Sequence, residues 1–189
     1  KRRESAEGEH HLAHAAQQLP TTDAQRAELD ALARWIGAQG GTRYAVRSSA
    51  ADEDAPDTSF AGMYETLLGV PGAEVEAAVR RCFAAAFDPR VASYRRFHAR
   101  ATDALRFAVI VQRQIDSEVA GVGFSLDPLS NDYDHAVIAA NWGLGSSVVD
   151  GRITADEYVV DKLTHRVLRR SVGEKRIAFG LAPDGGTIE

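Results

Sequence analysis

Residues 44–50 read Tyr-Ala-Val-Arg-Ser-Ser-Ala, and residues 58–62 read Thr-Ser-Phe-Ala-Gly. The first segment continues a short predicted strand that begins at Arg43, and its Arg47 offers a planar fork of donors suited to phosphate oxygens. The second segment consists mostly of small residues, which let backbone N–H groups approach a phosphate closely. Together the two segments suggest a grip on a polyphosphate. An arginine at a strand end is more often part of a surface ion pair, and the residues alone leave that alternative open.

A glycine segment at residues 141–147 reads Asn-Trp-Gly-Leu-Gly-Ser-Ser and follows a predicted strand. A nucleotide-binding loop is one interpretation of glycines in that place. The segment lacks the Gly-x-Gly-x-x-Gly spacing, and no Gly-Lys-Ser/Thr follows it. A structural turn is therefore the favoured interpretation.

The first half of the chain has an α/β pattern. A helix is predicted over residues 22–36, where Thr22 and Gln25 have the spacing of a capping box. A second amphipathic helix is predicted over residues 73–87, and Cys82 beside its apolar stripe is expected to pack in the core. The apolar stripe of that helix recurs every four residues, at Val75, Val79, Phe83 and Phe87. A third helix is predicted over residues 90–100.

The second half of the chain is rich in predicted strands. Apolar runs indicate strands over residues 107–112, 119–127 and 136–141. Residues 157–162 and 166–170 alternate around Leu163-Thr164-His165 and are expected to form a hairpin.

Composition limits the possible functions. The chain has 189 residues, a net charge of −5 and one cysteine, which argues against a nucleic-acid binder, a disulfide framework and a cysteine-based zinc site. No apolar run approaches the roughly 18–20 residues of a membrane span, so we expect a cytoplasmic protein with no membrane partner. His10 and His14 share a helix face, but a solvated face is favoured over a metal site.

Residues 44–50, together with Ser59–Gly62 and the Glu65-Thr66 pair, resemble the ATP-binding domain of phosphoenolpyruvate synthase. Pyruvate phosphate dikinase and rifamycin phosphotransferases share that domain. The resemblance covers most of residues 43–162 in the right order. Its further blocks are residues 81–83, 94–95, 111–112, 120–128, 142–145, 151–152 and 158–161.

This resemblance implies an α/β (α+β) fold of the ATP-grasp type, in which two lobes hold the nucleotide between them, here incomplete at both ends. We expect a polar segment over residues 1–20, a first lobe with a glycine-rich flap over 21–105, and a truncated strand-rich second lobe over 106–189. Arg47 would contact the ATP phosphates and act in catalysis, Thr66 would begin the strand leaving the flap, and Gln112 would lie beside the adenine. The expected flap residues are Ser59, Phe60, Ala61, Gly62 and Met63.

The resemblance also implies a reaction. ATP would pass its β-phosphate to a histidine on a separate domain, in the same parent chain or in a partner subunit, and then to an acceptor such as pyruvate. A rifamycin hydroxyl is the alternative acceptor. The family's lysine, its Mg²⁺ ligands and its carrier histidine are expected outside these 189 residues. Family members usually carry glutamate near Ala139 and at Ser146, and a non-catalytic nucleotide-binding module acting with a partner is the further alternative.

Overall fold

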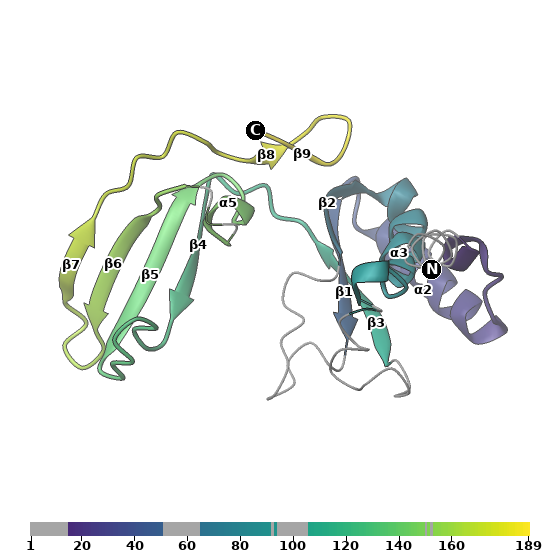
Figure 1. Cartoon of the computed structure of the whole chain (residues 1–189). Coiled ribbons are helices and arrows are strands. Elements are labelled where there is room, and N and C mark those ends of the chain that lie inside the picture. Colours follow the sequence, from purple (N-terminus) through teal and green to yellow (C-terminus); the bar gives the residue numbers. More distant parts are fainter. Residues whose placement is uncertain (1–14, 51–64, 92, 94–105, 150, 152) are drawn as a thin grey trace. The chain divides into compact units, whose positions relative to one another are not determined.

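The computed structural model describes residues 15–50, 65–91, 93, 106–149, 151 and 153–189. The chain divides into two compact units, Lys1–Gln114 and Ile115–Glu189 (Figure 1). Both contain strands, and the first adds long helices, so the fold is of mixed α and β structure. The first unit extends to Gln114 because the strand over 107–113 pairs within it, and the lobe boundary expected at residue 105 stays a prediction. That the two units are ATP-grasp lobes stays a prediction.

The main elements described in the first unit are two helices, α2 and α3, and three strands, and residues 15–18 and 89–91 are also helical. Helix α2 begins where the sequence predicts: the Thr22 Oγ1 accepts from the Gln25 N–H at 3.2 Å, and the Gln25 Oε1 accepts from the Thr22 N–H at 2.9 Å. None of the helices in the described part of the chain has the length and apolar character needed to cross a membrane. The elements in order are α2 (Asp23–Ala38), β1 (Arg43–Ala50), β2 (Thr66–Pro71), the 3₁₀ turn η1 (Gly72–Glu74), α3 (Val75–Ala85) and β3 (Phe107–Arg113).

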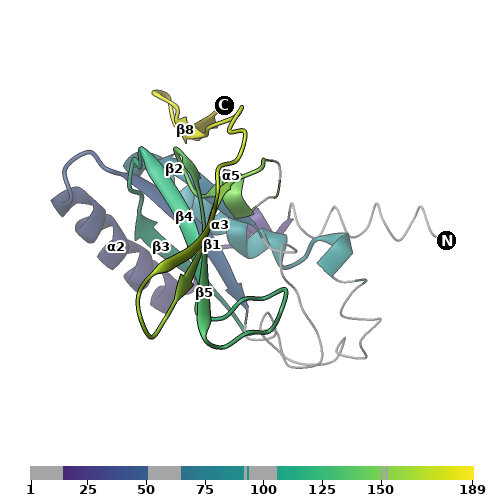
Figure 2. The same ribbon diagram turned by 90° about the vertical axis from the view of Figure 1, so that its left-hand side faces the viewer.

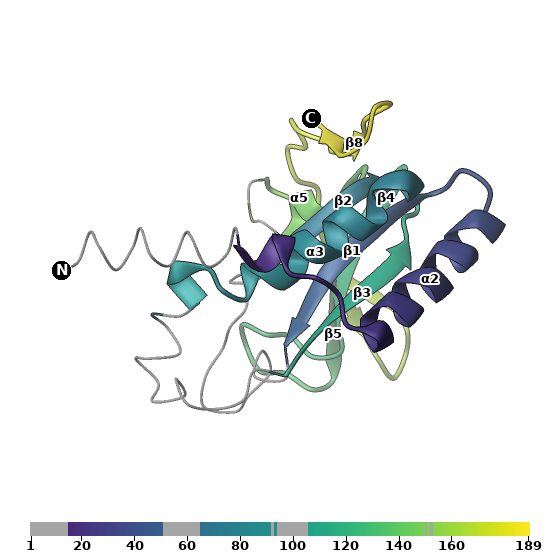
Figure 3. The same ribbon diagram turned by 90° about the vertical axis from the view of Figure 1, so that its right-hand side faces the viewer.

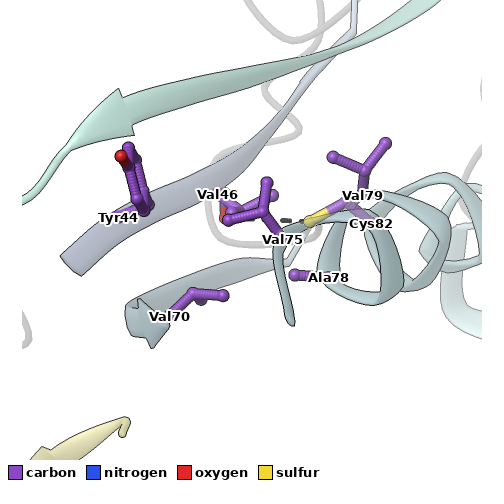
Figure 4. Close-up of a cluster of buried hydrophobic side chains, with 7 residues drawn as sticks. All are labelled: Tyr44, Val46, Val70, Val75, Ala78, Val79 and Cys82. Carbon is purple, nitrogen blue, oxygen red and sulfur yellow. Dashed lines mark hydrogen bonds between the residues drawn. The ribbon is translucent and has the colours of Figure 1, made fainter. Parts of the chain in front are cut away.

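Both helices cover the same face of an antiparallel sheet whose strand order is β2-β1-β3 (Figure 3). Side chains alternate across a strand, and Tyr44 and Val46 of β1 point toward the helices. Figure 4 shows the cluster that they form with residues of β2 and α3. Its members are Tyr44, Val46, Val70, Val75, Ala78, Val79 and Cys82, with Leu29, Leu32 and Ile36 of α2 packed against it.

The apolar stripe predicted for α3 is only half right. Val75 and Val79 are buried, but Phe83 and Phe87 are exposed. A helix turns about 100° per residue, so a spacing of four drifts by about 40° at each step and leaves the buried face within two steps. Spacings of three and four keep Ala78 and Cys82 on that face, which confirms the expected packing role of Cys82.

A one-residue shift in register separates the two ends of the β1–β2 pair. Tyr44 pairs with Val70, whereas Val46 pairs with Leu67 and Arg47 with Thr66. One extra residue of β2 is accommodated between these pairs. Gly69, within this stretch, has a φ of 67°, a left-handed conformation that glycine adopts readily.

The second unit is built on a four-stranded antiparallel sheet of order β4-β5-β6-β7 (Figures 1 and 2). The predicted hairpin is confirmed, and it turns at His165, which has a φ of 57°. The elements are β4 (Val119–Phe124), β5 (His135–Trp142), the short helix α5 (Ser146–Val149), β6 (Asp156–Asp161), β7 (Val167–Ser171), and the small pair β8 (Gly180–Leu181) and β9 (Thr187–Ile188).

The burial of Cys82 predicts slow thiol chemistry. Burial, and then the negative charge of Glu65, raise the pKa of the Cys82 thiol from 9.0 to about 11. At pH 8 its thiolate fraction is then about 100-fold below that of an unperturbed thiol, since each pKa unit is a factor of ten. We expect iodoacetamide to label the tryptic peptide 82–90 far more slowly in native protein than in urea, as measured by mass spectrometry.

The raised pKa of Cys82 also makes the stability of the protein depend on pH. The thiol ionises at a lower pH in the unfolded chain than in the folded protein, so its contribution to the free energy of unfolding is complete below pH 9 and is lost as the pH rises toward 11. Equal labelling rates in native and unfolded protein at pH 8 would contradict this account of the Cys82 environment.

Candidate functional site

Arg47 lies on the face of the first unit's sheet that is opposite α2 and α3, here called the outer face. Tyr44 and Val46 point into the core, so the alternation of side chains directs Arg47 to the other side of β1. Its side chain is exposed. The helices that bury one face of the sheet thus leave the guanidinium on the face that they do not cover.

Strand pairing brings three further side chains beside Arg47. Thr66 of β2 pairs with Arg47 from one side, and Ile110 of β3 pairs with it from the other. Gln112 lies two residues along β3, opposite Ala45, and therefore on the same face. We call Arg47, Thr66, Ile110 and Gln112 the outer-face patch.

The outer-face patch combines a cation, a hydroxyl, an amide and an apolar side chain, and all four side chains are exposed. Ile110 is 50% exposed, although it lies within a strand. Among the described residues, no carboxylate forms an ion pair with Arg47 and no side chain accepts a hydrogen bond from it. A guanidinium without an acidic partner among these residues can donate to an anion, and the apolar side chain beside it suits a flat ring.

Of the residues predicted from the sequence, Arg47, Thr66 and Gln112 come together in this patch. The flap residues Ser59 to Met63 lie outside the described residues, and so do His10 and His14. Contact of any of these residues with ATP stays a prediction. The sequence does not single out Ile110, because an apolar run does not show which of its members face the core. The sequence feature that could have indicated Ile110 is its position two residues before Gln112, which places both side chains on the same face of the strand.

The glycine segment at residues 141–147 forms a structural turn, the interpretation that its sequence favours. Gly143 has a φ of 76°, and a Cβ atom at this position would overlap the carbonyl oxygen of Phe179. That same oxygen accepts a hydrogen bond from the Leu144 N–H at 2.7 Å. Nearby, the buried Asn141 side chain donates to the Ser147 Oγ at 2.9 Å and to the Ile177 carbonyl at 3.0 Å. The segment therefore packs against residues 177–179 of its own unit.

Substitution of Gly143 by alanine tests this packing. The left-handed backbone alone costs an alanine about 1–2 kcal/mol, and the overlap with Phe179 adds to that cost. Gly186 is a matched control in the same unit, since its φ is 75° and a Cβ atom there would meet nothing within 4 Å. Chemical denaturation should show a larger loss of unfolding free energy for Gly143→Ala than for Gly186→Ala. Equal losses would mean that the close approach to Phe179 is unimportant.

Comparison with known families places the chain among nucleotide-binding domains. The family model of the AMP/ATP-binding domain of pyruvate phosphate dikinase matches residues 6–189, almost the whole chain. The chain belongs to this family.

Several named proteins are clearly similar to the chain. A probable phosphoenolpyruvate synthase of Methanothermobacter thermautotrophicus is 44% identical over 146 residues, which are 77% of this chain and 21% of that protein. The phosphoenolpyruvate synthase of Pyrococcus furiosus is 38% identical over 143 residues, 75% of this chain and 18% of that protein. The prodigiosin synthesizing transferase PigC of Serratia marcescens is 42% identical over 136 residues, 71% of this chain and 15% of that protein. The chain thus spans about a fifth or less of these relatives.

The Mg²⁺ that the dikinase family implies has no complete site in the part of the chain that the structure describes. No group of three or more His, Cys, Asp or Glu side chains there could hold a metal ion. Ala139, where family members usually carry glutamate nearby, lies on β5 opposite Glu157 of β6. The Glu157 carboxylate is paired with Arg169 at 2.6 Å. These residues therefore do not fit a metal.

Proposed function

We propose that this chain is the ATP-binding part of a dikinase-type phosphotransferase of the phosphoenolpyruvate synthase kind. In such an enzyme the β-phosphate of ATP passes to a histidine of another domain, leaving AMP and phosphate, and then to pyruvate. Membership in the AMP/ATP-binding domain family and the names of the archaeal relatives support this proposal. The observation that carries it is Arg47, exposed and without an acidic partner among the described residues, at the centre of the outer-face patch.

Each member of the outer-face patch has a role in this proposal. Arg47 donates two parallel hydrogen bonds to phosphate oxygens, and the Thr66 hydroxyl donates another from the neighbouring strand. Ile110 lies against the ribose or base, and the Gln112 amide faces the polar edge of the adenine. Phosphoryl transfer mainly requires that the phosphates are positioned and their charge is neutralised, and residues on strands provide a rigid support for both.

The proposal also includes a phosphate acceptor and a carrier histidine, neither of which is assigned to these residues. Pyruvate is proposed first because several relatives are named phosphoenolpyruvate synthases. An antibiotic hydroxyl, as in a rifamycin phosphotransferase, is the second candidate. The similarity to a protein named as a prodigiosin synthesizing transferase supports an acceptor other than pyruvate only distantly. A nucleotide-binding module without its own catalysis is the third.

Replacement of Arg47 tests the phosphate contact. Loss of a hydrogen bond to a charged group costs about 1.5–3 kcal/mol, so Arg47→Ala should raise the Kd of ATP roughly 10- to 150-fold. Isothermal titration calorimetry on the full-length protein would measure it. Arg34→Ala is the matched control, because Arg34 is an exposed arginine of α2, the helix on the opposite face. An unchanged Kd for Arg47→Ala would remove the site assignment.

Replacement of Ile110 tests where the nucleoside lies. If Ile110 packs on the ribose or base, Ile110→Ala loses buried apolar area worth about 1 kcal/mol, or roughly fivefold in the Kd of ATP. The affinity for tripolyphosphate, which has no nucleoside, should stay unchanged. Competition binding with the two ligands separates these outcomes. Equal losses for both would place Ile110 beside the phosphates or show a general change in the sheet.

A further inference from the structure

We propose that Arg81 is a positioning residue: through Glu65 it holds the start of β2, and thereby keeps Thr66 beside Arg47. This inference rests on the proposed function, since it explains how the outer-face patch is kept in shape. It concerns four residues, Ser48, Glu65, Arg81 and Cys82, here called the β2 anchor. Two of them are chain neighbours of patch residues, because Ser48 follows Arg47 and Glu65 precedes Thr66.

The backbone part of the β2 anchor is a single carbonyl group. The Glu65 carbonyl oxygen accepts hydrogen bonds from the Ser48 N–H at 3.1 Å and from the Ser48 Oγ at 2.8 Å. The Cys82 Sγ lies 3.9 Å from the same oxygen. It also lies 3.7 Å from the Val46 carbonyl oxygen, the contact that Figure 4 shows as a dashed line. β1 and α3 therefore meet at the residue that comes directly before Thr66.

The side-chain part of the β2 anchor is an ion pair. The Arg81 guanidinium, on α3, pairs with the Glu65 carboxylate. The Arg81 side chain is 59% exposed and that of Glu65 is 27% exposed. Exposed pairs of this kind typically change unfolding equilibria by no more than about fivefold. The pair is thus too weak to be a main support of the unit, but it acts directly on the residue next to the patch.

The two parts together restrain Glu65 in different directions. Ser48 holds its carbonyl toward β1, and Arg81 holds its carboxylate toward α3. Displacement of a contact group by about 1 Å is enough to reduce binding or catalysis strongly. Release of the carboxylate therefore loosens the start of β2 and misplaces Thr66 relative to Arg47.

The same helix supplies an internal control pair. Arg80 and Glu76 form an ion pair at 3.0 Å, with side chains 28% and 47% exposed. Arg80 also donates to the Leu19 carbonyl at 3.2 Å, and Glu76 lies 3.5 Å from Arg26 of α2. This pair thus links α3 to α2 and its preceding segment, whereas Arg81 links α3 to β2. If ion pairs of α3 affect only the stability of the protein, replacement of Arg80 and replacement of Arg81 will have the same effect on ATP binding.

The test compares Arg81→Gln, Glu65→Gln and Arg80→Gln in the full-length protein. We expect the first two to raise the Kd of ATP about two- to fivefold, with a melting temperature lowered by no more than about 2–4 °C. Arg80→Gln should leave the Kd unchanged. The double variant Glu65→Arg with Arg81→Glu restores the pair with opposite charges and should recover most of the affinity. Equal Kd values for Arg81→Gln and wild type would overturn the proposal.

A double-mutant cycle with Arg47→Ala separates positioning from a general structural effect. If Arg81 acts through the Arg47–Thr66 arrangement, Arg81→Gln should weaken ATP binding less when Arg47 is already alanine. Fully additive effects would contradict the proposal. An Arg47→Ala variant that binds ATP normally would instead remove the proposed function, so the two failures are distinguishable.

Discussion

The burial of Tyr44 and Val46 against α2 and α3 is the constraint on which the first unit depends. Side chains of a strand alternate, so once these two point into the core, Arg47 must point to the outer face. β1 is the central strand of its sheet, and its two neighbours take their facing directions from it through the pairing register. This one-sided burial decides which face Arg47 occupies, and the pairing register then decides which residues of β2 and β3 lie beside it.

The bulge in β2 decides which residue accompanies Arg47. With the register of Tyr44 and Val70 continued unchanged, Leu67 would lie opposite Arg47 and Thr66 opposite Ser48. An apolar side chain would then lie beside the cation, and a hydroxyl would face the core. The extra residue, in a stretch that contains Gly69 with its positive φ, exchanges these partners. A local backbone feature therefore selects the chemistry of the patch.

Local signals predict much of this architecture from the sequence. Contacts between residues close in the sequence account for two correct predictions, the capping box at Thr22 and the hairpin around residue 165. The core position of Cys82 follows from the apolar face that repeats along its helix. Motif resemblance indicates Arg47, Thr66 and Gln112, and strand pairing brings them to one face.

The features that the sequence does not predict depend on contacts between distant segments. The exposure of Ile110 depends on which face of β3 the helices cover, and the apolar run 107–111 has no polar residue that would mark it. The missing information is which surface packs against each face of the strand, and the sequence of a single strand does not contain it.

The glycine segment at residues 141–147 shows why composition alone does not identify a phosphate site. At Gly143 the absence of a side chain admits the backbone of Phe179, and the left-handed φ completes a turn that the unit itself fills. A glycine that is already in contact with its own chain has no room for a ligand there. The patch around Arg47 differs because its donors have no acidic partner among the described residues, and its neighbours across two strands are exposed. The distinguishing property is thus a set of donors without an acidic partner among the described residues. It favours the outer face of the first unit's sheet over the glycine turn of the second for the proposed nucleotide binding.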